Sequence, residues 1–282
     1  MFVRIARKPL QKNRSPRAVP YLDLESHRLH YRIDGDTAAS GKPWLMFCNS
    51  VGTDLHMWAA QVAALSHQYR LLRYDRRGHG LSSAPPPPYA LSDLGHDVIA
   101  LLDALEIERA HFCGLSIGGL TGQWLAIHAG ERLDKLVVCA TSAKIGTAES
   151  WVARIAAVRE NGIGELAAAT AERWFTPEFR TAEGGTVREM RDTFAATKVD
   201  GYIGCCAALA GADLREEVGR IANPVLAVSG EDDPVCPPAD LEGIAVGVHW
   251  GRHVSLPGRH MVNVESASAF NAALIEFLDS DW

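Results

Sequence analysis

The sequence predicts an α/β protein with a mostly parallel sheet and helices on both of its faces. Short runs rich in Val and Leu alternate with longer amphipathic segments from Pro20 onward. The later apolar runs are continuous, as in parallel strands that are buried on both faces. The chain has 282 residues, of which 47% are hydrophobic, and this length suits one large domain with an insertion.

Eight segments have the length and composition of strands. They are Tyr21–Leu24, Leu29–Ile33, Trp44–Cys48, Arg70–Tyr74, Ala110–Gly114, Leu133–Ala140, Val225–Ser229 and His249–Leu256. No apolar run approaches the roughly 20 residues that a membrane-spanning helix needs. We therefore expect no integral membrane segment and no membrane partner.

Helices are predicted between these strands. Ser92 is expected to cap a helix with a stripe of leucines at helical spacing, and Glu265–Leu278 is expected to form a C-terminal helix. The alternation stops over residues 142–214, which are rich in Ala and helical in pattern. We expect this segment to be a helical lid inserted after the sixth strand, so that residues 19–141 and 215–282 form the core.

The distribution of charge narrows the choice of partners. The chain has 28 Lys and Arg against 34 Asp and Glu, for a net charge of −6. Residues 1–18 hold six of the basic residues and no acidic one, which leaves 22 basic against 34 acidic residues elsewhere. An acidic body repels phosphate backbones, so we expect no nucleic-acid partner. Residues 1–18 are interpreted as a basic, disordered extension without a catalytic role.

The cysteines indicate the redox compartment. The six cysteines include no CxxC pair, and the adjacent Cys205 and Cys206 are poorly placed for a disulfide or a zinc site. Residues 1–18 lack the apolar segment of a secretory signal. We therefore expect a reducing, cytoplasmic location and no metal site.

The run Gly114-Leu115-Ser116-Ile117-Gly118-Gly119 is the strongest local signal for chemistry. It follows a predicted strand and opens a helix that is predicted to reach about Ala129, which is the setting of a G-x-S-x-G nucleophile elbow. Glycines are needed because such a turn is too tight for side chains beside the serine. The Ser116 hydroxyl would then project above the sheet at a helix N-terminus. A glycine-rich turn with an incidental serine is the alternative.

A serine nucleophile needs a histidine base, and the base needs an acid that orients it. In chain order the acid follows such an elbow and the histidine comes last. The loop after the seventh predicted strand holds Glu231, Asp232 and Asp233, and spacing alone does not choose among them. We select Asp233, with Asp232 as the alternative. His260 follows the last predicted strand and is selected as the base.

The oxyanion that forms when a serine attacks a carbonyl group needs preorganised backbone N–H donors. Ile117, which directly follows Ser116, is expected to supply one donor. The turn Asn49-Ser50-Val51-Gly52 follows the third predicted strand and is expected to supply the other donor through Val51.

Several motifs carry a resemblance to a known family. Asn49-Ser50-Val51-Gly52-Thr53-Asp54, Arg73-Tyr74-Asp75 and Arg77-Gly78-His79-Gly80 resemble the α/β-hydrolase superfamily. More narrowly, the chain resembles bacterial 3-oxoadipate enol-lactonases of aromatic catabolism from about Val19 to its end. The runs that carry this narrower resemblance are His111-Phe112-Cys113-Gly114-Leu115-Ser116, Arg173-Trp174-Phe175-Thr176-Pro177 and Gly201-Tyr202-Ile203-Gly204-Cys205-Cys206-Ala207-Ala208. Ser50 departs from the glycine that most superfamily members have there, although the enol-lactonase pattern accepts it.

The resemblance implies the α/β-hydrolase fold, with an eight-stranded sheet and a lid after the sixth strand. It implies hydrolysis of 3-oxoadipate enol-lactone to 3-oxoadipate in the β-ketoadipate pathway, by a triad of Ser116, His260 and Asp233. An acyl-enzyme on Ser116 and direct attack by water use the same residues, and both stay open. No metal or organic cofactor is implied. The expected partner is the small-molecule substrate, and the oligomeric state is open between monomer and homodimer.

The carboxylate of such a substrate needs a cation or N–H donors in an acidic protein. The candidates in or near the lid are Lys144, Arg154, Arg173, Arg191 and Lys198, and nothing in the sequence selects among them. Trp151 and Trp124 are expected to wall the substrate pocket.

Other functions on the same fold remain open at this point. A carboxylesterase, a perhydrolase-like enzyme or a C–C bond hydrolase would differ in the shape of the lid. A non-catalytic ligand receptor would lack a triad member, and none is missing from the sequence. A binding protein that uses the lid as an interaction module would expose a large apolar patch there.

Overall fold

An eight-stranded sheet forms the centre of the computed structural model, in the order β1-β2-β4-β3-β5-β6-β7-β8. The β1/β2 and β2/β4 pairs are antiparallel and the other five pairs are parallel, which confirms the predicted sheet. The structure describes residues 19–35 and 41–281, so the extension expected at residues 1–18 lies outside the described residues.

The strands lie close to their predicted positions. They are β1 (Tyr21–Asp23), β2 (Arg28–Asp34), β3 (Trp44–Cys48), β4 (Arg70–Tyr74), β5 (Ala110–Leu115), β6 (Leu133–Cys139), β7 (Val225–Gly230) and β8 (Gly251–Leu256). The bounds of β3 and β4 match the prediction residue for residue. The last strand begins at Gly251 instead of His249, because His249 and Trp250 belong to the turn that leaves α9.

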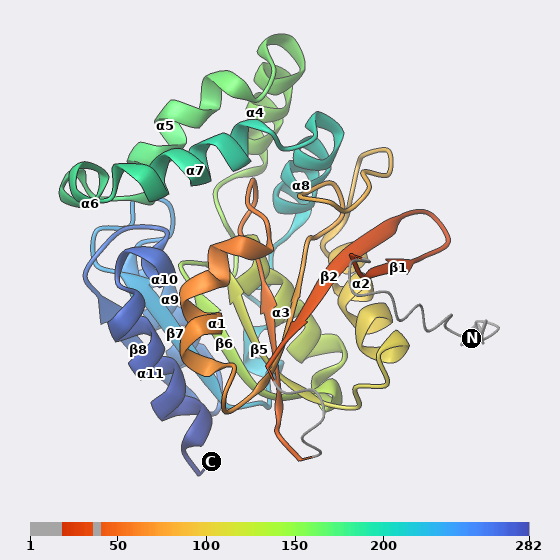
Figure 1. Ribbon diagram of the computed structural model, residues 1–282, viewed down its shortest axis with the longest axis vertical. Helices are drawn as coiled ribbons and strands as arrows, with labels where there is room; N and C mark the ends of the chain where they lie inside the picture. The colour runs from red at the N-terminus through yellow and green to blue at the C-terminus, as the bar shows by residue number, and fades with distance from the viewer. Residues whose placement is uncertain (1–18, 36–40, 282) are drawn as a thin grey trace.

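Two groups of helices surround the sheet (Figure 1). The helices that flank the sheet are α1 (Ala59–Leu65), α2 (Leu91–Ala104), α3 (Ile117–His128), α9 (Pro238–Gly247), α10 (Val262–Glu265) and α11 (Ala267–Asp279). The helices between β6 and β7 are α4 (Ala148–Asn161), α5 (Gly164–Trp174), α6 (Pro177–Ala182), α7 (Gly184–Ala195) and α8 (Val199–Gly211). Short 3-10 turns are η1 (Leu55–Trp58), η2 (Gly130–Arg132) and η3 (Val218–Arg220).

The apolar strands separate two hydrophobic layers. Successive residues of a strand point to opposite faces of the sheet. Met46 and Phe112 therefore belong to the layer that holds the apolar residues of α2, α3 and α9. Their neighbours Leu45 and Cys113 belong to the layer that holds those of α1 and α11. Burial on both faces explains the continuous apolar runs in the sequence.

Two helix boundaries differ from the prediction. The N-cap of α2 is Ala90, not Ser92, because the Asp93 carboxylate accepts a hydrogen bond from the Ala90 N–H at 2.8 Å. The C-terminal helix is divided at Ser266, whose backbone is not helical (φ −114°, ψ 44°). The Ser266 hydroxyl donates to the Pro257 carbonyl there, and this bond accompanies the break between α10 and α11.

The inserted helices α4–α8 gather at one end of the sheet, at the top of Figure 1. A close backbone contact joins them to the core, since Gly201 of α8 lies directly against Gly78 in the loop after β4. Gly78 has a φ of +80°, which favours glycine. Within residues 19–35 and 41–281, no helix is both long and apolar enough to cross a membrane.

The contact between Gly201 and Gly78 generates a prediction about stability. A Cβ at Gly201 would lie 2.3 Å from the Gly78 Cα, so Gly201→Ala forces the α8 backbone and the loop apart. We expect a loss of about 1–3 kcal/mol in the free energy of unfolding, as for other overpacked sites. Gly211→Ala is the matched control in the same helix, because nothing lies within 4 Å of its added Cβ. Thermal unfolding measures both, and equal melting temperatures would contradict the prediction.

Candidate active site

Ser116 lies in a strained turn between β5 and α3. Its backbone has φ 59° and ψ −121°, a region that residues other than glycine rarely adopt. The turn is held because the Ser116 N–H donates to the Cys139 carbonyl of the neighbouring strand at 2.9 Å. The residue is only 4% exposed. The strand, the turn and the helix therefore occur where the sequence predicts a nucleophile elbow.

Close backbone approaches explain the glycines on each side of Ser116. A Cβ on Gly114 would lie 2.2 Å from the Gly118 carbonyl oxygen. A Cβ on Gly118 would lie 2.2 Å from the Cys48 carbonyl oxygen at the end of β3. Any larger residue would separate β5 from α3 or α3 from β3.

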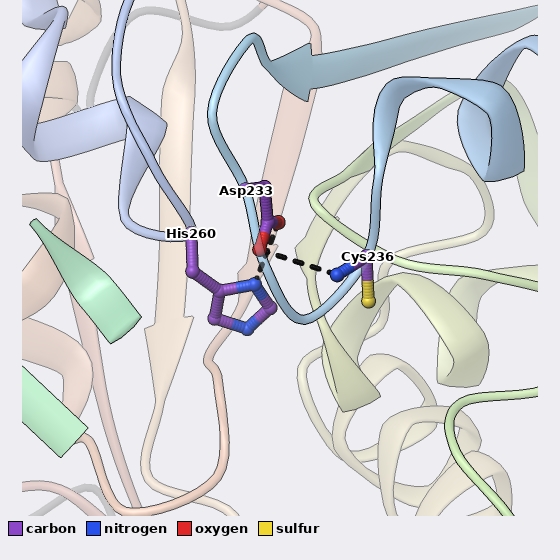
Figure 2. Close-up of side chains that lie close together, drawn as sticks. All are labelled: Asp233, Cys236 and His260. Carbon is purple, nitrogen blue, oxygen red and sulfur yellow. Dashed lines mark hydrogen bonds and ion pairs between the residues drawn. The ribbon is translucent and has the colours of Figure 1, made fainter. Parts of the chain in front are cut away.

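His260 and Asp233 form a buried pair (Figure 2). The His260 Nδ1 lies 2.8 Å from Asp233 Oδ2, so the second ring nitrogen, Nε2, takes no part in this hydrogen bond. Asp233 Oδ1 accepts hydrogen bonds from the backbone N–H groups of Val235 at 2.7 Å and Cys236 at 3.2 Å. Asp232 is exposed. The structure thus brings Asp233, and not Asp232, to His260.

Asp233, Cys236 and His260 offer ligand atoms within 4.8 Å of one another, which raises the question of a metal site. In Figure 2 the dashed lines join the carboxylate to the His260 ring and to the Cys236 backbone nitrogen, not to its sulfur. Both oxygens of the Asp233 carboxylate are already hydrogen-bonded, Oδ2 to the His260 ring and Oδ1 to two backbone N–H groups. The three residues fit an acid–histidine pair with a neighbouring thiol better than a metal centre.

A cavity of about 230 Å³ is lined both by residues at the end of the sheet and by residues of the helices between β6 and β7. This volume is below the roughly 300–1,000 Å³ of pockets for drug-sized ligands, which suits a small molecule. Ser116 and His260 both line it. The other lining residues are Ser50, Val51, Ile145, Gly146, Ser150, Trp151, Arg154, Thr170, Arg173, Trp174, Phe194, Tyr202, Pro234 and Val235.

Two backbone amides are candidate oxyanion donors, one in Ile117, which directly follows the cavity-lining Ser116, and one in Val51. Ile117 is the first residue of α3, where helix N–H groups have no acceptor within the helix. Val51 lines the cavity, and no described residue accepts a hydrogen bond from its N–H. The turn that carries Val51 is fixed through Asn49, whose side chain donates to the Tyr74 carbonyl and accepts from Trp58 Nε1, both at 2.9 Å.

The cavity contains two guanidinium groups that the sequence did not single out. Arg154 donates to the Tyr202 hydroxyl at 3.3 Å, and Arg173 donates to the Thr170 hydroxyl at 3.0 Å. Among the described residues, neither arginine forms an ion pair with a carboxylate, and the cavity lining contains no Asp or Glu. Burial lowers the pKa of Arg173, and the nearby charge of Arg154 lowers it further. Two neighbouring cations that form no ion pair with a described residue favour an anionic ligand.

The other three cations considered for a substrate carboxylate are engaged elsewhere. Lys144 pairs with Asp213 at 3.0 Å, and Arg191 pairs with Asp192 at 3.0 Å. Lys198 donates to two backbone carbonyls in the loop after β4. The spacing of Arg154 three residues after Trp151 could have suggested that the two share a helix face.

The two tryptophans have different positions. Trp151 lines the cavity, and its Nε1 donates to the Ile145 carbonyl at 2.6 Å. Trp124 lies on the other side of α3 and does not line the cavity, so the expectation for this residue is corrected. Its ring stacks on His128 at 4.5 Å and packs against Gly95 of α2. The sheet-facing side of α3 is formed by small residues such as Gly122, which turns the large ring outward.

Comparisons with known proteins place the chain among hydrolases. A family model described as alpha/beta hydrolase fold matches residues 43–266. Two enol-lactonases of Acinetobacter baylyi are similar: 3-oxoadipate enol-lactonase 2 is 46% identical, covering 90% of this chain and 94% of that protein. 3-Oxoadipate enol-lactonase 1 is 40% identical, covering 89% and 93%.

A solved structure agrees with these relatives. The crystal structure of the enol-lactonase from Burkholderia xenovorans LB400 has a TM-score of 0.91 and 44% identity, over 93% of this chain and all of that one. The strained serine turn, the buried acid–histidine pair and the sheet order are together typical of one fold family. The chain belongs to the alpha/beta hydrolase family.

Proposed function

We propose that the protein is a serine hydrolase that opens 3-oxoadipate enol-lactone, a small cyclic ester bearing a carboxylate, to 3-oxoadipate. The observation that carries the proposal is the cavity itself, where Ser116 and His260 lie with the unpaired arginines Arg154 and Arg173. The first two residues suit ester cleavage, and the arginines suit an anionic substrate. The choice of this lactone is supported by relatives of that name at 46% and 40% identity.

In the acyl-enzyme route, the first half of the reaction attaches the substrate to Ser116, whereas direct attack by water with His260 as the base would use the same residues. His260 Nε2 takes the hydroxyl proton of Ser116 while the serine oxygen bonds to the lactone carbonyl carbon. The Ile117 and Val51 N–H groups hold the resulting oxyanion. The ring C–O bond then breaks, and the departing enol oxygen receives the proton from His260. The enol becomes the ketone by tautomerisation.

The second half releases the product. His260 takes a proton from water, and the hydroxide oxygen bonds to the acyl carbon. The bond to Ser116 breaks, and the serine oxygen regains its proton from His260. Asp233 keeps the ring in the orientation that leaves Nε2 free, and its charge stabilises the imidazolium that forms in each half.

We further propose that residues 142–214 act as a lid over a core made of residues 19–141 and 215–282. Ser116, Val51 and His260 come from the core, whereas Trp151, Arg154 and Arg173 come from the inserted helices. A closed lid would exclude water and hold the substrate carboxylate away from the reacting ester. The core would supply the bond-breaking groups and the insertion would supply recognition.

We place this activity in the cytoplasm. All six cysteines are buried free thiols. Unpaired thiols are typical of a reducing compartment. The proposed substrate is a small diffusible molecule, which requires neither a membrane nor a nucleic acid.

The first experiment compares the wild type with Ser116→Ala on 3-oxoadipate enol-lactone generated in the cuvette, followed by ultraviolet absorbance. We expect the variant to lose about 10⁴-fold or more in kcat, because the nucleophile is gone. A panel of p-nitrophenyl esters is measured alongside. Turnover of the simple esters with none of the lactone would leave the serine assignment intact and overturn the substrate. No turnover of either would favour a ligand receptor.

The roles of the two aspartates can be separated by paired substitutions. Asp233→Asn removes the charge that faces His260 and allows the wrong ring tautomer, so we expect kcat to fall by about 10³–10⁴-fold. Asp232→Asn is the matched control, since Asp232 is the exposed neighbour and should stay within about twofold, as surface substitutions usually do. Steady-state kinetics decides, and a larger loss in the control would reverse the assignment.

The two arginines should affect the charged substrate selectively. We expect Arg154→Gln or Arg173→Gln to raise KM for the lactone by about 10–100-fold, the value of one charge-assisted hydrogen bond. Hydrolysis of p-nitrophenyl acetate, which has no carboxylate, should change little. Arg191→Gln is the control, because Arg191 is exposed and already paired with Asp192. Equal losses on both substrates would contradict carboxylate recognition.

A further inference from the structure

Two buried threonines donate hydrogen bonds to the peptide groups that carry the two candidate donor amides. Thr141 Oγ1 donates to the Ser116 carbonyl at 2.7 Å. Thr53 Oγ1 donates to the Ser50 carbonyl at 2.9 Å. The Ser116 carbonyl belongs to the same peptide group as the Ile117 N–H, and the Ser50 carbonyl belongs to the same group as the Val51 N–H. Each threonine therefore binds the carbonyl oxygen of a peptide group whose N–H is one of the two candidate donors.

The two threonines come from opposite sides of the strand that presents Ser116. β5 pairs with β3 on one side and with β6 on the other. Thr53 follows β3, and Thr141 follows β6. Both side chains are almost completely buried, at 3% and 0% exposed, and neither lines the cavity. Neither threonine can therefore touch a substrate that occupies this cavity.

The acceptors of these hydroxyl groups are well defined. The Thr53 hydroxyl also lies 3.0 Å from the Met57 sulfur, but a hydroxyl has one proton and a thioether is the weaker acceptor. The Ser116 carbonyl additionally accepts the Leu120 N–H of α3 at 3.0 Å. The Ser116 peptide group is thus held by the helix and by Thr141 together, and its N–H end faces away from both.

We propose that Thr53 and Thr141 are positioning residues that orient and polarise the two amide donors of the oxyanion site. The proposal rests on the proposed function, in which Val51 and Ile117 hold the oxyanion. A hydrogen bond to an amide oxygen draws electron density away from the nitrogen, which makes the N–H a stronger donor. It also fixes the plane of the peptide group before the oxyanion forms.

The effect should be specific to the transition state. The carbonyl oxygen of a bound ester is neutral, whereas the oxyanion carries a full charge, so a stronger donor stabilises the second more than the first. Weakening a donor should therefore lower kcat and leave KM nearly unchanged. Deleting one oxyanion donor costs about 10²–10³-fold in kcat, and weakening one should cost less, about 5–30-fold.

Thr121 offers a matched control. It is also completely buried, and its hydroxyl donates to the Ile117 carbonyl at 2.7 Å. That carbonyl belongs to the peptide group that ends in the Gly118 N–H, which is neither of the two proposed oxyanion donors. Thr121→Val removes the same kind of hydrogen bond within the same turn of helix without affecting either proposed donor.

The experiment measures kcat and KM for Thr53→Val, Thr141→Val and Thr121→Val on the lactone and on p-nitrophenyl acetate. We expect kcat to fall about 5–30-fold in the first two variants and to change less than about twofold in the third. Thr53→Ser and Thr141→Ser keep the hydroxyl and should restore most of the activity. Affinity for the product 3-oxoadipate should not change, whereas affinity for a carboxyalkyl boronic acid, which forms a tetrahedral adduct on Ser116, should fall with kcat.

Several outcomes would overturn the proposal. Folded valine variants with wild-type kcat would do so, and so would serine variants that are as slow as the valine variants. Parallel losses in product affinity, boronic acid affinity and the Thr121→Val activity would indicate a general packing role. If a valine variant does not fold, the alanine variant of that position takes its place. The p-nitrophenyl acetate data test the threonines even if the lactone is not the substrate, so the two failures can be distinguished.

Discussion

The site depends on the close packing of backbone around the turn at Ser116. Gly114 touches Gly118, and Gly118 touches the carbonyl groups at the end of β3, so the strand, the helix and the neighbouring turn cannot move independently. This packing holds Ser116 in a conformation that costs of order 1–3 kcal/mol by itself. The strain persists because the sheet on both sides of β5 defines the turn, through the Cys139 carbonyl on one side and the Asn49 turn on the other.

The charge of the cavity lining is opposite in sign to the net charge of the chain. The chain as a whole carries a net charge of −6, yet the cavity lining contains two guanidinium groups and no carboxylate. Asp233, the acid that faces His260, does not line the cavity and is hydrogen-bonded to two backbone N–H groups and to the ring. In the proposed function, an anionic substrate therefore meets positive charge from α4 and α5, and no carboxylate lines the cavity that it enters.

The sequence predicts the sheet well because strands that are buried on both faces are short, mostly apolar segments that can be recognised locally. Trp44–Cys48 is a continuous apolar segment that follows a polar turn, and its bounds agree with the structure. The glycines around Ser116 are a local signal of the same kind, because the tight turn leaves no space for side chains at those positions. Helix boundaries are harder to predict where two capping residues compete. The Asp93 carboxylate caps α2 at Ala90, two residues before Ser92, which the sequence predicts as the N-cap.

Residues whose roles depend on partners far away in the sequence cannot be recognised from a local sequence pattern. The position of Trp151 at the start of the predicted lid favours it as a pocket residue, whereas only the small residues on one side of α3 direct Trp124 toward α2. Arg154 and Arg173 differ from Lys144 and Arg191 because, among the described residues, neither forms an ion pair after folding. Thr53 and Thr141 lie 88 positions apart in the sequence, and they bind peptide groups in the turns that follow β3 and β5. Their common role follows from the peptide groups they bind, because an amide oxygen and the N–H beyond it respond to the same hydrogen bond.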